Sequence, residues 1–149
     1  MIHDLKESPS IYVIIKNPVE PLLREVLAGI EEEGIPYKID KSSYEGVSEE
    51  DDVYNSSVKS RLGIGIGLFK NRIILHYDKL RVNEPIFDIN LKSNDKNKAR
   101  AIGCNAARLY KQVPFKTLES IEENNEILDD ISIDDLKEKI LKILKSKMN

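Results

Sequence analysis

Three consecutive glutamates, Glu31, Glu32 and Glu33, are the residues of this sequence best suited to hold a cation. They follow a segment in which aliphatic residues recur with helical spacing, so they are expected in the last turn of a helix over residues 21–33. A helix C-terminus carries about half a negative charge, and each acid there is disfavoured by about 0.3–1 kcal/mol. Because local folding does not favour this run, two explanations remain open. The glutamates form either a solvated acidic face or an edge that binds a partner or a metal.

The helical periodicity predicts which of the three carboxylates points outward. The apolar stripe of the helix consists of Leu23, Val26, Leu27 and Ile30. At roughly 100° per residue, Glu32 points away from that stripe. The outer face is completed by Glu25, Ala28 and Gly29, with Glu31 and Glu33 at its flanks. Glycine inside a helix costs about 1 kcal/mol relative to alanine, so we expect something to pack closely over Gly29.

The remaining metal-binding and nucleophilic side chains are few. One carboxylate cluster suits Mg²⁺ or Ca²⁺ only if further oxygen ligands come from elsewhere. Cys104 is the only cysteine, which excludes an internal disulfide and favours a small buried residue. His76 is followed by Tyr77 and Asp78, with no nucleophile beside it, so a structural or interface role is expected.

Gly63, Gly65 and Gly67 alternate with aliphatic residues, which is typical of a strand with one bare face. A phosphate-binding loop would need its glycines in a turn between a strand and a helix, and this run leads into a hairpin instead. We therefore expect the bare face to be approached closely by a helix, a partner chain or a ligand.

The other patterns predict an α/β arrangement. Expected strands cover residues 11–15, 35–39, 62–69, 72–77 and 85–89, and expected helices cover 21–33, 53–61, 96–113 and 133–147. The first two strands and their helix form a parallel βαβ unit, and a turn at Lys70 and Asn71 makes one strand antiparallel.

Length and charge limit the organisation and the partners. The 149 residues suit a single domain, with an α/β unit over residues 1–116. Residues 117–149 are expected to form an acidic linker and a docked amphipathic helix of the same domain. The net charge of -3 gives no electrostatic reason to expect nucleic-acid binding. No apolar run reaches the length of a membrane span, so a cytosolic protein is expected.

Several separated blocks resemble the small subunit of the diol/glycerol dehydratase-reactivating factor. They occur in the right order, cover roughly residues 10–116, and comprise residues 23–36, 62–67, His76, 85–87, 103–109 and 114–115. The medium subunit of the adenosylcobalamin-dependent dehydratase shares these blocks and is the alternative. Shorter flanks favour the reactivase, as do Ser60-Arg61 and Leu68-Phe69-Lys70 around the glycine strand, where the dehydratase subunit tends to have small polar residues beside cobalamin.

The resemblance implies a three-layer α/β/α fold like an anticodon-binding domain, with a mixed five-stranded sheet and one antiparallel strand. It also implies a non-catalytic partner that binds an actin-like ATPase subunit and dehydratase subunits and binds no cofactor alone. A glutamate matching Glu32 would complete a Mg²⁺ or Ca²⁺ site on the ATPase subunit, and Glu25, Ala28, Gly29, Glu31, Glu33, Gly63, Gly65 and Gly67 are the interface candidates. Cobalamin would be bound only if the chain were the medium subunit of the dehydratase. The location would be the cytoplasm or a bacterial microcompartment.

Overall fold

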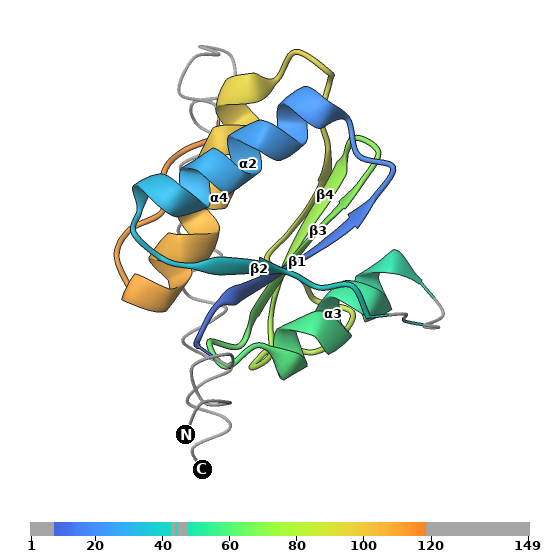
Figure 1. Cartoon of the computed structure of the whole chain (residues 1–149), viewed down its shortest axis with the longest axis vertical. Coiled ribbons are helices and arrows are strands. Elements are labelled where there is room, and N and C mark those ends of the chain that lie inside the picture. Colours follow the sequence, from blue (N-terminus) through green and yellow to red (C-terminus); the bar gives the residue numbers. More distant parts are fainter. Residues whose placement is uncertain (1–7, 43, 45–47, 119–149) are drawn as a thin grey trace.

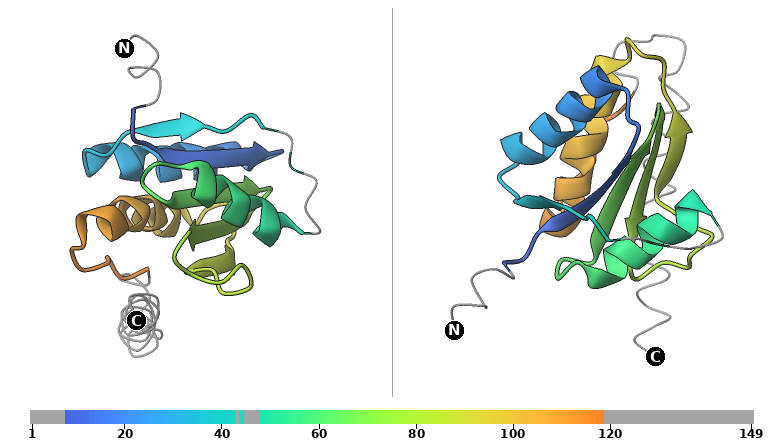
Figure 2. Two further views of the ribbon diagram at one scale, coloured as in Figure 1. Left: turned by 90° about the horizontal axis from the view of Figure 1, so that it is seen from below. Right: turned by 45° about the vertical axis from the view of Figure 1, so that its right-hand side comes forward.

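The computed structural model describes residues 8–42, 44 and 48–118, which form a sheet between two layers of helices (Figure 1). Along the chain the elements are β1 (Ile11–Lys16), α2 (Glu20–Glu32), β2 (Tyr37–Ile39), α3 (Glu49–Lys59), β3 (Ile64–Phe69), β4 (Arg72–Tyr77), β5 (Phe87–Asn90) and α4 (Lys96–Lys111). Figure 2 shows α2 and α4 on one face of the sheet and α3 on the other. The predicted three-layer α/β/α fold is confirmed.

The sheet has five strands in the order β2-β1-β3-β4-β5. β1 pairs in parallel with both β2 and β3, whereas β4 is antiparallel to β3 and β5. β4 is therefore the single strand that runs against the others, as the Lys70–Asn71 turn predicted. Lys70 adopts the left-handed conformation, with φ of 60°, that this tight turn requires.

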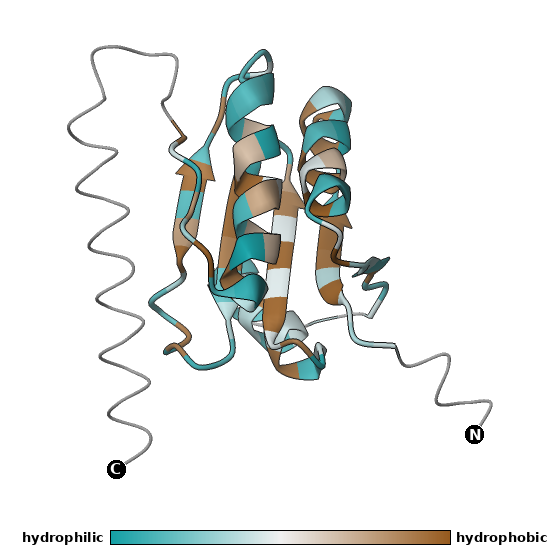
Figure 3. Ribbon diagram, turned by 90° about the vertical axis from the view of Figure 1, so that its left-hand side faces the viewer, coloured by the Kyte–Doolittle hydropathy of each residue, from teal (hydrophilic) through white to brown (hydrophobic). Residues whose placement is uncertain are grey.

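The main core lies between the sheet and the pair α2 and α4. In Figure 3 the strands behind these helices are mostly hydrophobic and the outward turns of the helices are largely hydrophilic. The buried members of this layer include Val13, Val26, Ile66, Leu75 and Ile102, all with no exposed surface. Burial of this layer fixes α2 and α4 side by side, which decides where the charged residues of both helices meet.

Several element boundaries differ from the sequence prediction, and two of the differences have a clear local cause. α3 begins at Glu49 rather than at Val53, because the Ser48 side chain accepts a hydrogen bond of 3.1 Å from the Asp51 backbone and caps the helix. Gly63 lies before β3, in a turn with φ of 77°, so it is not part of the strand face formed by Gly65 and Gly67. The Ser48-x-x-Asp51 spacing was the local signal for the earlier helix start.

After α4 the chain folds back along the helix as a segment over residues 112–118. Asn105, which is fully buried, binds both polar groups of the Lys116 backbone, accepting from its N–H at 2.6 Å and donating to its carbonyl at 3.0 Å. Phe115 packs against Phe87 with ring centroids 6.1 Å apart. The predicted helix over 133–147 and most of the predicted linker lie outside the described residues.

Across residues 8–42, 44 and 48–118, no helix has both the length and the apolar character needed to span a bilayer.

Candidate functional site at the contact between α2 and α4

α2 and α4 approach each other at two glycines. A methyl group added at Gly29 would overlap the Arg100 carbonyl, and one added at Gly103 would overlap the Val26 carbonyl. The close packing predicted over Gly29 is therefore confirmed, but its partner is α4 of the same chain. Gly29 is buried, because α2 packs one flank against the sheet and another against α4.

The three glutamates at the end of α2 point to different surroundings. Glu31 is exposed and accepts a long hydrogen bond of 3.4 Å from the Tyr37 hydroxyl. Glu32 is also exposed, as the periodicity predicted, and Glu33 turns inward so that its side chain is only 9% exposed. Only Glu31 and Glu32 therefore remain accessible to a partner.

Glu33 is neutralised by the end of α4. Its carboxylate lies 2.9 Å from Arg108 Nε and 2.7 Å from Lys111 Nζ, and Lys111 also donates to the Glu33 carbonyl. Burial raises the pKa of Glu33, but the hydrogen bonds from Lys111 and Arg108 outweigh it and leave the pKa below its ordinary value. The acids that local helix physics disfavours are thus stabilised by basic residues from a second helix.

Glu32 has two cationic neighbours and remains accessible. Its Oε1 accepts from Arg100 Nε at 2.7 Å, and its Oε2 lies 3.4 Å from Lys116 Nζ. Arg100 also donates through Nη1 to Glu25, at 2.8 Å. The hydrogen bond from Arg100 lowers the pKa of Glu32 most, and Lys116 lowers it further against the effect of burial. Glu32 is therefore an ionised carboxylate at the protein surface.

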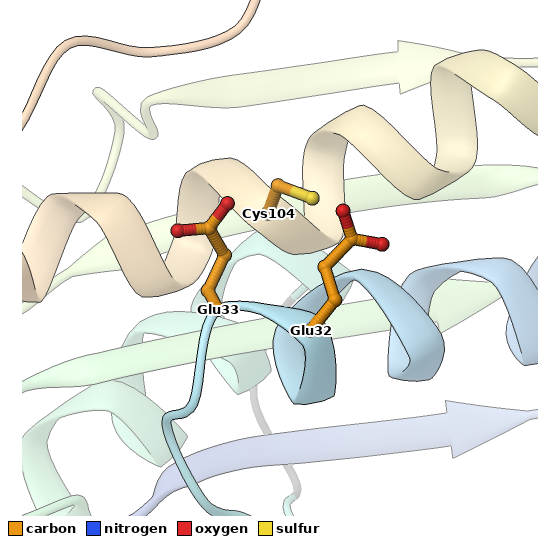
Figure 4. A group of neighbouring side chains, drawn as sticks. All are labelled: Glu32, Glu33 and Cys104. Atoms are coloured by element: carbon orange, nitrogen blue, oxygen red, sulfur yellow. The ribbon is translucent and has the colours of Figure 1, made fainter.

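Glu32, Glu33 and Cys104 place one potential ligand atom each within 4.8 Å of one another (Figure 4). In Figure 4 both carboxylates project from the end of α2 toward α4, which carries the thiol. Mg²⁺ and Ca²⁺ prefer oxygen ligands, and burial raises the pKa of the Cys104 thiol. The Glu33 carboxylate is already paired with the side chains of Arg108 and Lys111. These three residues alone do not form a hard-cation site, and Glu32 is the one member of the group whose side chain is exposed.

A pocket of about 340 Å³ lies beside Glu32 on the same side of α4. Its lining comprises Asn97, Arg100, Ala101, Lys116 and Thr117. Arg100 and Lys116 therefore contact both the pocket and the Glu32 carboxylate.

The bare face of the glycine strand is covered by α3. Methyl groups added at Gly65 would come within 2.8 Å of the Ser57 nitrogen and the Val53 oxygen, and one at Gly67 would meet the Val53 side chain. Close approach by a helix is confirmed, and the helix belongs to this chain. In this arrangement Gly65 and Gly67, which are buried, are not available to a partner.

His76 has no exposed surface and lies on β4 against α3. Its Nδ1 accepts from the Tyr77 backbone at 2.9 Å, its Nε2 is 3.0 Å from the Val82 carbonyl, and Tyr54 packs edge-on against the ring. These contacts fix the loop after β4, which agrees with the structural role expected for this residue.

A model of the family described as dehydratase medium subunit matches residues 8–116. This match spans most of the chain and nearly all of its described part. The chain belongs to the dehydratase medium subunit family. The resemblance drawn from the sequence motifs is thereby confirmed at the level of the family.

Within this family, the similar curated proteins are subunits of reactivating factors. The chain is 34% identical over 113 residues to the diol dehydratase-reactivating factor small subunit of Klebsiella michiganensis, covering 76% of this chain and 88% of the relative. It is 34% identical over 113 residues to the propanediol dehydratase-reactivating factor small subunit of Citrobacter freundii, covering 76% of this chain and 95% of the relative. These similarities favour the reactivating factor over the dehydratase itself.

Solved structures agree with this placement. A structure of diol dehydratase-reactivating factor complexed with ADP and Mg²⁺ contains a chain 33% identical to this one, with a TM-score of 0.62 over 73% of this chain and 98% of that one. A glycerol dehydratase reactivase chain, 23% identical, shares the fold with a TM-score of 0.65 over 74% of this chain and 99% of that one.

The sequence prediction of the site missed the basic residues that face the glutamates. Arg100, Arg108 and Lys111 recur along α4 at helical spacing, and this basic stripe was the available signal. The family shared with reactivating factors and the acidic end of α2 were both visible in the sequence. The pairing of the acidic end of α2 with α4 was not visible in the sequence, because it depends on how the two helices dock.

Proposed function

We propose that this chain is the non-catalytic small subunit of a factor that reactivates diol or glycerol dehydratase. It binds a larger, actin-like ATPase subunit and helps to release damaged cobalamin from the inactivated dehydratase. The observation that carries this proposal is similarity at 33–34% identity over 88–95% of the length of three small subunits of such factors.

The covered glycine strand supports a role other than lining a cobalamin site. A corrin ring is a flat group that needs an open face, and α3 packs on Gly65 and Gly67 at backbone contact distance. Cobalamin therefore cannot lie on this face of Gly65 and Gly67 while α3 is packed against it.

Glu32 is the residue through which the chain takes part in a metal site of its partner. It is an exposed, ionised carboxylate, and a single carboxylate suits a Mg²⁺ or Ca²⁺ site whose other oxygen ligands come from the ATPase subunit and from water. Glu25, Ala28 and Glu31 lie on the accessible part of the same helix and belong to the proposed interface. The relative of known structure that was solved with ADP and Mg²⁺ is consistent with such a shared ion.

A reconstitution experiment tests the proposed function. Dehydratase inactivated with cyanocobalamin is mixed with the large subunit of a diol dehydratase-reactivating factor, ATP and Mg²⁺, with or without this chain. We expect cobalamin release, followed by absorbance, to require both subunits, and we expect no spectral change when cobalamin is mixed with this chain alone. Tight cobalamin binding by the isolated chain would contradict the proposal.

Calorimetric titration against the large subunit tests Glu32 directly. Glu32→Gln keeps the volume and one acceptor oxygen but removes the charge that a hard cation favours. We expect weaker binding in Mg²⁺ and unchanged binding in EDTA. Glu31→Gln is the matched control, since it removes the neighbouring exposed acid, and it should preserve the effect of Mg²⁺. Equal affinities of wild type and Glu32→Gln in both conditions would exclude the metal role.

A further inference from the structure

The two oxygens of the Glu32 carboxylate are held unequally. Oε1 receives a hydrogen bond of 2.7 Å from Arg100 Nε, which is a short charge-assisted contact. Oε2 is 3.4 Å from Lys116 Nζ, near the upper limit for a hydrogen bond. Replacing the cationic partner of Oε2 therefore costs less free energy than replacing the partner of Oε1.

Arg100 is fixed from two sides. The planar guanidinium donates through Nε to Glu32 and through Nη1 to Glu25, which lies two turns earlier on α2. A planar fork that binds two carboxylates holds both in a defined orientation. If Glu32 shares its charge with another cation, Arg100 keeps Glu25 as a counter-ion and can stay in place.

Lys116 is held differently. Its backbone is fixed by the buried Asn105, while its ammonium sits at the end of a flexible side chain that is 38% exposed. The pocket lined by Asn97, Arg100 and Thr117 adjoins it and offers space for a displaced ammonium. Lys116 can therefore leave Glu32 without any change in the backbone.

We infer that Arg100 positions the Glu32 carboxylate for a shared divalent cation, whereas Lys116 competes with that cation for Oε2. This inference rests on the function proposed above. Glu25 and Glu32 balance Arg100 and Lys116, so the cluster has no net charge until Lys116 withdraws. A divalent cation brought by the partner then meets one uncompensated negative charge on an oriented carboxylate.

A matched pair of variants tests this inference. Arg100→Met and Lys116→Met each remove one positive charge and keep an unbranched side chain. If charge alone mattered, both would strengthen Mg²⁺-dependent binding of the ATPase subunit, and if both residues were merely structural, both would weaken it. We expect opposite effects.

The expected effects are measured as the ratio of affinities in Mg²⁺ and in EDTA, by calorimetric titration of the large subunit. Arg100→Met should lower this ratio by roughly tenfold, as is typical for loss of a group that orients a metal ligand. Lys116→Met should raise it by about threefold, since an exposed ion pair that competes with the metal is lost. Arg108→Met and Lys111→Met, which remove the partners of Glu33, are the controls and should leave the ratio unchanged.

The outcomes separate this inference from the proposed function. Absence of binding by the wild-type chain would overturn the proposed function and the inference with it. Wild-type binding that depends on Mg²⁺, with both variants shifted in the same direction, would overturn the inference alone. In the free chain, the Arg100 Nε–H should exchange slowly with solvent by ¹⁵N NMR and rapidly in Glu32→Gln, and fast exchange in the wild type would also overturn it.

Discussion

The two faces of the sheet are stabilised in different ways. The face under α2 and α4 buries eighteen apolar residues in one cluster, whereas the face under α3 buries four, namely Ile14, Val53, Phe69 and Ile74. Hydrogen bonds replace apolar area on the α3 face, where Ser56 donates to Asp40 at 2.7 Å and Ser60 donates to the Ser10 carbonyl at 2.6 Å.

This difference separates a rigid scaffold from a more weakly held layer. Apolar burial stabilises by about 25 cal/mol per Å², so the α2 and α4 face supplies most of the driving force for folding among the described residues. The acidic end of α2 lies on this strong face, which keeps Glu32 in a fixed position. α3 fills the space over the glycine strand with small residues and polar contacts, so we expect it to open first.

The largest effect is expected at the crossing of the two helices. Gly103→Val places a side chain against the Val26 carbonyl, and both backbones are fixed by the main core. We expect a loss of about 3 kcal/mol or more in the free energy of unfolding, measured by urea denaturation. Ala28→Val, at a half-buried position on α2, is the control and should cost much less. Similar losses for the two variants would contradict the close crossing.

Acid should weaken the α3 face selectively through Asp40. Burial raises the pKa of Asp40, but hydrogen bonds from Tyr44, Ser56 and Ser42 outweigh this and lower it to about 2 from an ordinary 3.8. Because the folded pKa is depressed, this stabilisation is present above pH 4 and is lost as the pH falls through 2. The difference corresponds to about 2 kcal/mol.

Asp40→Asn should remove this part of the pH dependence between pH 5 and pH 2, measured by denaturation at each pH. Asp95→Asn is the control, because the Asp95 side chain binds only the exposed Lys92 backbone among the contacts described. An unchanged acid profile in Asp40→Asn would show that the network on the α3 face contributes little to stability.

A smaller and local effect is expected at the glycine strand. Gly65→Ala brings a methyl group within 2.8 Å of the α3 backbone, and α3 can shift because few apolar contacts hold it. We expect a cost of about 1 to 2 kcal/mol. Hydrogen exchange should accelerate in α3 and stay unchanged in α2 and α4, whereas equal acceleration in all three helices would contradict the difference between the faces.

The smallest effect is expected at the surface of the acidic cluster. Glu32→Gln loses exposed contacts to Arg100 and Lys116 but relieves the unfavourable helix C-terminus, so stability should change by less than about 0.5 kcal/mol. Glu33→Gln removes a carboxylate that is only 9% exposed and binds Arg108 and Lys111, and should cost about 1 kcal/mol or more. Equal costs, measured by thermal and urea denaturation, would contradict the distinction between the two acids.

The sequence by itself determined the features that depend on neighbouring residues. Periodicity located α2 and α4 to within two residues, glycine alternation identified β3, and the Lys70–Asn71 pair identified the hairpin. These signals are local, because the spacing of side chains along a helix or strand follows from backbone geometry alone. The periodicity did not reveal the start of α3, because its cap, Ser48, lies within a polar stretch that has no apolar stripe.

Only the tertiary structure decided what the distinctive residues contact. Gly29 and Gly65 both require a close neighbour, and the sequence could not say whether this neighbour was a partner or another helix of the chain. The partners of Glu32 and Glu33 are 68 to 84 positions away in the sequence. Such pairs form only once apolar burial has docked α4 beside α2, and no local pattern contains that information.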